Sequence, residues 1–75
     1  MKYEEIIKRV NWGEEFCFYY DNEEYWISQD GLKKYLTRVS DSMTQEFQTA
    51  EELFEHGKIK GKFLKDIWND IEKYF

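Results

Sequence analysis

The sequence predicts an α+β domain in which one N-terminal helix, a three-stranded antiparallel meander and two C-terminal helices follow in the order αβββαα. Apolar residues recur at helical spacing near both ends of the chain. The stretch between residues 15 and 39 is rich in aromatic residues, and two turn signals divide it into three. With 75 residues and no linker-like segment, residues 1–75 are expected to form a single domain, a meander packed by helices.

The first helix is predicted from an apolar stripe near the N-terminus. Tyr3, Ile6, Ile7 and Val10 follow the i, i+3, i+4, i+7 spacing of an amphipathic helix. Gly13 stands just beyond this stripe, where a helix commonly ends. The chain therefore begins with a helix whose apolar side needs a partner.

Three strands are expected next, at residues 15–20, 23–29 and 32–39. Asp21-Asn22 joins the first two, because both residue types tolerate the left-handed conformation of tight hairpin turns. Asp30-Gly31 marks a second tight turn into the third strand. This arrangement is an antiparallel meander.

The second half of the chain is predicted to be mainly helical. Ser40–Gln48 is polar and is expected to be a loop, with a short edge strand at residues 46–48 as the alternative. Thr49 and Glu52 have the spacing of a capping box, which predicts a helix from residue 50 to about His56 with Gly57 at its C-cap. A last helix is expected from about residue 62 to the end. Its apolar stripe consists of Phe63, Leu64, Ile67, Trp68, Ile71 and Phe75.

Two-residue turns would fix the strand register and so divide the side chains between two faces. One face is almost entirely apolar and is the better core. Phe18 is expected to lie opposite Tyr25, Tyr25 opposite Leu36, and Ile27 opposite Lys34, whose ammonium group must reach out at the rim. This core face contains Phe16, Phe18, Tyr25, Ile27 and Leu36, with Leu64 and Trp68 of the last helix over the row Phe18–Tyr25–Leu36.

The opposite face is expected to carry a row of Cys17, Trp26 and Tyr35. Tyrosine and tryptophan beside charged groups are typical of protein-binding surfaces. In the alternative interpretation the first helix covers this face and makes it a second small core; cross-strand aromatic pairs also stabilise a sheet without any ligand. The flanking rows are Tyr19, Glu24 and Thr37, and Glu15, Ser28 and Lys33. The candidate partner-binding residues are Tyr19, Glu24, Trp26, Tyr35 and Glu15.

The chain is acidic, with a net charge of −5, and the charge is unevenly placed. Residues 1–30 hold eight acids and three bases, whereas residues 31–75 hold eight of each. Direct nucleic-acid binding is not expected, because phosphate recognition needs clustered Lys and Arg. An acidic surface favours a basic protein partner, although carboxylates also keep an aromatic-rich domain soluble. No apolar run is long enough for a membrane span, and the single cysteine predicts a reducing, cytoplasmic environment.

Residues that could support catalysis or metal binding are few. One His56 and one Cys17 cannot supply the four ligands of a structural zinc site, and they lie on different predicted elements. The segment from Gly57 to Phe63 is one residue short of a phosphate loop, and Phe63 stands where Ser or Thr would bind magnesium. We therefore expect no enzymatic activity, cofactor or metal.

Two stretches together resemble a group of small, mostly uncharacterised single-domain proteins from bacteria and mobile elements. Tyr25-Trp26-Ile27-Ser28 fits a Y-x-I-S pattern, and Glu51-Glu52-Leu53-Phe54 fits E-E-L-F. The run from Ile59 to Trp68 fits I-x-G-K-x-L-x-x-I-W. The resemblance implies a strand, a capped helix and a packing helix, and it carries no catalytic residue across.

These features predict a small acidic inhibitor that binds a basic, nucleic-acid-processing protein. The concrete form is an immunity-type protein that neutralises a toxin or nuclease; small acidic inhibitors of this kind share the chain's size and charge. One alternative is a phage-borne anti-defence inhibitor of the anti-CRISPR type. Another is a homodimeric structural or regulatory module that pairs through the sheet face with Cys17, Trp26 and Tyr35 or through strand edges.

Overall fold

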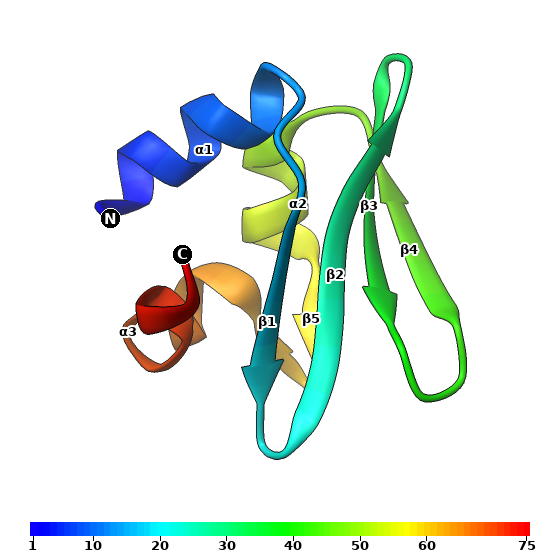
Figure 1. The fold of residues 1–75 in the computed structure, drawn as a ribbon, viewed down its shortest axis with the longest axis vertical. Helices are drawn as coiled ribbons and strands as arrows, with labels where there is room; N and C mark the ends of the chain where they lie inside the picture. Colours follow the sequence, from blue (N-terminus) through cyan, green and yellow to red (C-terminus); the bar gives the residue numbers. More distant parts are fainter.

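Four antiparallel strands form a meander whose helices all lie on the same side of the sheet (Figure 1). The computed structural model describes residues 1–75. Its elements are α1 (Tyr3–Asn11), β1 (Phe16–Tyr20), β2 (Glu23–Asp30), β3 (Lys33–Arg38), β4 (Met43–Phe47), α2 (Ala50–His56), β5 (Lys58–Ile59), β6 (Lys62–Phe63), η1 (Leu64–Ile67), α3 (Trp68–Ile71) and η2 (Glu72–Tyr74). The sheet order is β1-β2-β3-β4, and β5-β6 form a separate hairpin. None of the helices is long and apolar enough to cross a membrane.

The α+β class is confirmed, but the sheet has four strands and not three. Residues 43–47, expected to be mostly loop, form β4 and pair with β3 along their whole length. A polar sequence is tolerated there because an edge strand has only one neighbour and much of it faces solvent. β4 is therefore held in the sheet mainly by its backbone hydrogen bonds to β3, and burial of its own apolar side chains contributes little.

The C-terminal segment is not the continuous helix that its apolar stripe predicts. Lys60 and Gly61 adopt positive φ angles of 53° and 82° and turn the chain into the β5-β6 hairpin. After this hairpin, residues 64–74 alternate between 3₁₀ and α geometry. The stripe is nevertheless buried at Leu64, Ile67, Trp68 and Ile71. Burial of the stripe determines the conformation of this segment, because a helix this short has little stability of its own.

The first hairpin has the predicted register, with Phe18 opposite Tyr25 and Cys17 opposite Trp26. Asp21 and Asn22 have φ angles of 51° and 65°, as a type I′ turn requires. The turn and the register of the β1-β2 hairpin therefore agree with the prediction.

The second hairpin is shifted by two residues from the prediction. Its turn is Gly31-Leu32, so that Asp30 lies opposite Lys33 and Ile27 lies opposite Leu36. Gly31 has a φ of +61°, which suits the first central position of a type II′ turn. Because the shift is even, every side chain keeps its predicted face and only the rows change.

The buried core lies between the inner face of the sheet and the helices. Phe18 stacks on Tyr25 with their ring centroids 5.6 Å apart, and Phe75 lies 5.3 Å from Phe18 and 5.2 Å from Trp68. The predicted pairing of Phe18 with Tyr25 is confirmed. Leu36 is buried, but the shifted register places it opposite Ile27 and not opposite Tyr25.

Lys34 is buried, and so the prediction that it reaches out at the rim is wrong. Only 6% of it is exposed, and its Nζ donates a hydrogen bond of 3.5 Å to the backbone carbonyl of Asn11. Asn11 is the last residue of α1, where the helix dipole favours a positive charge. The ammonium group thus meets the carbonyl end of a helix in place of solvent.

Helix α2 begins as its capping box predicts. The Thr49 hydroxyl accepts a hydrogen bond of 3.1 Å from the backbone N–H of Glu52, and the Asn11 side chain accepts one of 2.9 Å from Ala50. Gly57 is the C-cap, but its φ of −66° is an ordinary one. A Cβ at Gly57 would lie 2.4 Å from the carbonyl oxygen of Leu53, so close approach, and not backbone conformation, requires glycine.

Candidate protein-binding surface

The face of the sheet that points away from the helices is uncovered. We call it the outer face; it presents alternate side chains of β1 to β4. Trp26 is 48% exposed and Tyr19 is 47% exposed. Helix α1 buries Ile6 and Val10 in the core on the other side, so the alternative in which α1 covers these rings is wrong.

Trp26 lies at the centre of the outer face. Its neighbours across the strands are Cys17 on β1 and Thr37 on β3, with Thr44 of β4 next in the same row. The indole N–H donates a hydrogen bond of 3.0 Å to Oε2 of Glu24. This bond restrains the ring in an orientation that leaves about half of its surface in solvent.

Tyr35 is not in the row of Trp26, which corrects the predicted row Cys17–Trp26–Tyr35. The shifted second hairpin places Thr37 opposite Trp26 and places Tyr35 between Ser28 and Glu46. Tyr35 is half-buried, one row along the face. It belongs to the outer face but is not an immediate neighbour of the indole.

Tyr19 has an aromatic partner that the sequence did not reveal. The ring of Tyr74 in η2 lies 5.7 Å from that of Tyr19, and the Nζ of Lys73 lies 5.4 Å from the Tyr74 centroid. A continuous C-terminal helix gives no reason to expect Tyr74 beside the first strand. The broken segment brings it to the β1 edge and extends the exposed aromatic surface.

Carboxylates surround these rings. Alternation places Glu15, Glu24, Asp30 and Glu46 on the outer face, with Lys33 as its one ammonium group. Lys33 Nζ lies 2.9 Å from Oε2 of Glu46, and this carboxylate raises the pKa of Lys33. The one cation on the strands of this face is therefore already paired, and Lys73 beside Tyr74 is a second cation at the β1 edge. Carboxylates still outnumber cations on the outer face.

A shallow hollow of about 300 Å³ lies beside Trp26. Glu15, Cys17 and Ser28 share in its lining, so the structure brings Glu15 next to the indole. Four of the five candidate residues therefore gather around one patch, and Tyr35 lies at its margin. The patch consists of Trp26, Tyr19, Glu24 and Glu15.

The outer face offers no arrangement for metal or nucleophile chemistry. No cluster of three or more His, Cys, Asp or Glu side chains is placed to hold a metal ion. Cys17 is exposed on β1, whereas His56 ends α2 and packs edge-on against Phe63. The chemistry available on this face is aromatic contact, hydrogen bonding and negative charge.

No protein-family model, curated protein or solved structure matches the chain. The resemblance to small bacterial and mobile-element proteins therefore finds no support in these comparisons.

Proposed function

We propose that the outer face binds a basic protein and that the chain is a small acidic inhibitor covering the active face of that partner. Its concrete form is an immunity-type protein that neutralises a nucleic-acid-processing toxin or nuclease, with a phage-borne anti-defence inhibitor as the related form. The observation that carries the proposal is the exposure of Trp26 and Tyr19 on a face that no helix covers.

The exposed rings have the properties of binding anchors. Tryptophan and tyrosine are enriched among the residues whose truncation costs the most binding energy. Trp26 is held by Glu24, and Tyr19 packs against Tyr74. Rings that are restrained before binding lose less conformational entropy when a partner immobilises them. This preorganisation supports the patch as a contact surface.

The charge of the outer face supports a basic partner. Four carboxylates stand against one ammonium group, and that group is paired with Glu46. Unpaired carboxylates around an aromatic centre raise the association rate with a cationic surface and disfavour binding to phosphate backbones. The active face of a nuclease or toxin that handles nucleic acid is a surface of this cationic kind.

The test begins with capture from a lysate of the source cells, followed by calorimetry with the purified partner. Trp26→Ala is expected to weaken binding by at least about 2 kcal/mol, roughly 30-fold. Leu32→Ser is the matched control, because Leu32 is 88% exposed but lies in the β2-β3 turn outside the patch. If the partner is a nuclease, the wild-type chain should inhibit it and the Trp26→Ala variant should not at the same concentration.

A rate measurement tests the electrostatic part separately. Glu24→Gln should slow association at low ionic strength and have less effect at high salt, where surface charges are screened. Equal recovery of a partner by the wild-type chain and by Trp26→Ala would remove the aromatic anchor. A doubled mass in light scattering that Trp26→Ala returns to the monomer value would replace the proposal with a homodimer.

A further inference from the structure

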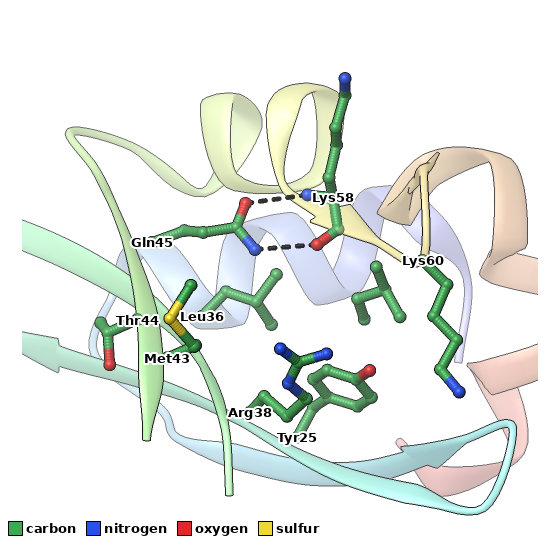
Figure 2. A pocket seen from close by; sticks show the side chains of 9 residues that line it. Tyr25, Leu36, Arg38, Met43, Thr44, Gln45, Lys58 and Lys60 are labelled. Atoms are coloured by element: carbon green, nitrogen blue, oxygen red, sulfur yellow. Dashed lines mark hydrogen bonds between the residues drawn. The ribbon is translucent and has the colours of Figure 1, made fainter. Parts of the chain in front are cut away.

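A second, unrelated site lies on the inner side of the sheet. A cavity of about 180 Å³ opens between strands β2 to β4 and the β5-β6 hairpin (Figure 2). Gln45 of β4 closes one side of it, because its amide pairs with the backbone of Lys58 through hydrogen bonds of 2.8 and 2.9 Å. The cavity is therefore built by elements that the fold fixes in place.

Tyr25 lines this cavity, and its buried hydroxyl has no hydrogen-bond partner. Tyr25 is 4% exposed, and its ring is held by stacking on Phe18. Its hydroxyl oxygen is the one buried side-chain polar atom in the structure that makes no hydrogen bond. Leaving a buried polar group unpaired is unfavourable, so an orphaned donor that lines a cavity points to a ligand.

Basic side chains flank this hydroxyl in an otherwise acidic chain. Figure 2 shows the Arg38 guanidinium beside the Tyr25 ring and the Lys60 side chain beyond the hydroxyl. Burial raises the pKa of Tyr25, the Glu23 carboxylate adds to the rise, and Arg38 and Lys60 oppose it. Both cations therefore act on the hydroxyl, although no donor of Arg38 meets hydrogen-bond geometry with it.

Each cation is held by one carboxylate and keeps donors to spare. Arg38 binds Asp41 through Nε and Nη2 at 3.1 and 2.9 Å, and Lys60 Nζ lies 2.8 Å from Asp21. A guanidinium has five N–H donors and an ammonium has three, so both can bind a second acceptor. Lys58 contributes backbone only, because its ammonium group lies over the Phe63 ring at 5.3 Å.

We propose that this cavity binds one small oxyanion group, a carboxylate or a phosphate, with the Tyr25 hydroxyl and the Arg38 guanidinium as donors and Lys60 as a flanking charge. Hydrogen bonds from such donors to an ionised oxygen are about twice as strong as neutral ones. The cavity has room for a group the size of several water molecules. The site does not depend on the outer face.

An NMR titration of the intact chain tests this, with inorganic phosphate in one arm and acetate in the other, at constant ionic strength set by chloride. Resonances of the Tyr25 ring and of Arg38 Nε should shift and saturate. Tyr25→Phe should weaken binding at least about tenfold, as loss of a hydrogen bond to a charged group does. A response to phosphate alone identifies a phosphate ligand, and a response to acetate alone identifies a carboxylate. No saturable response to either anion would overturn the proposal.

Matched variants distinguish anion binding in the cavity from nonspecific effects of the anion on the rest of the chain. Tyr20→Phe and Arg9→Gln should bind like the wild type, since both residues lie outside the cavity and Arg9 is likewise paired with carboxylates, those of Glu5 and Glu14. Asp41→Asn should tighten binding, because it removes the carboxylate that competes for Arg38.

The unfolding midpoint in urea gives an independent readout. Tyr25→Phe without anion should unfold at the same or a higher urea concentration, because the hydroxyl makes no bond to lose. Phosphate or acetate should raise the midpoint of the wild type and not that of the variant. A lower midpoint for Tyr25→Phe, or equal anion-induced shifts in the wild type and Tyr25→Phe, would overturn the proposal.

Discussion

Phe18 and Tyr19 are neighbours in β1, yet Phe18 is fully buried and Tyr19 is about half exposed. The same contrast holds between Tyr25 and Trp26 in β2. Strand geometry sends successive side chains to opposite faces, and all helical segments of this chain pack on one of them. A chain of 75 residues covers one face of its sheet, so the inner rings stabilise the fold and the outer rings remain available for binding.

The largest expected effect comes from truncating an inner ring. Phe18→Ala should lower the free energy of unfolding by about 3–5 kcal/mol, because it leaves a cavity under Tyr25 and Phe75. Urea unfolding followed by circular dichroism measures this change. Tyr19→Ala, one residue further along the chain, is the control and should cost less than about 1 kcal/mol. Similar losses in both variants would contradict the division between the two faces.

A smaller effect is expected where the inner face is closed at its edge. Gln45→Ala removes two hydrogen bonds to the backbone of Lys58 and should cost about 1–2 kcal/mol. Gln45→Glu can still accept from Lys58 N–H but cannot donate to its carbonyl oxygen. Its stability should fall at least as far as that of Gln45→Ala, and a wild-type urea midpoint for Gln45→Glu would remove this contact from the fold.

On the outer face, removing the largest ring should barely affect folding. Trp26→Ala should change the free energy of unfolding by less than about 0.5 kcal/mol, because half of the ring is already in water and only a surface bond to Glu24 is lost. The same urea experiment measures it. A loss of several kcal/mol would make Trp26 a core residue and would withdraw the proposed binding surface.

The smallest effect is expected from two exposed ion pairs near the turns of the sheet, Lys60–Asp21 and Arg38–Asp41. Hydrogen bonds from Lys60 and Arg38 lower the pKa of Asp21 and Asp41, respectively. A carboxyl group whose pKa is lower in the folded state adds stability above its unfolded pKa of about 4, and that stability is lost as the pH falls through the folded value. Asp21→Asn and Asp41→Asn should each make the urea midpoint fall less steeply between about pH 5 and pH 2. If the urea midpoint of the variants fell with pH as steeply as that of the wild type, these exposed pairs would contribute nothing to stability.

The positions of the strands and the division of their side chains were predictable from particular residues. Asp21-Asn22 determines the first hairpin because both residues accept positive φ. The core and outer faces follow from period-two alternation, which the two-residue shift at Gly31-Leu32 leaves intact. Thr49 and Glu52 were enough to locate the start of α2. These signals are local, so the sequence alone could carry them.

Other features depend on contacts between distant segments. Most residues of β4 carry no strand signal of their own, and their hydrogen bonds come from β3. Lys34 is stabilised at the end of α1, 23 positions away in the chain. Neither partner is visible in the local sequence, because propensity and periodicity describe a segment without its neighbours.

The sequence by itself therefore determined the α+β class, the first hairpin, the start of α2 and the face on which each aromatic ring of the first three strands lies, because turn conformation and side-chain alternation are local properties of the chain. Only the tertiary structure decided whether Trp26 is covered, that Tyr74 lies beside Tyr19, and that the Tyr25 hydroxyl is left unpaired beside Arg38. Each of these depends on where the helices and the β5-β6 hairpin pack. Their packing positions are determined by burial of the apolar surface of the whole chain, and no single segment specifies them.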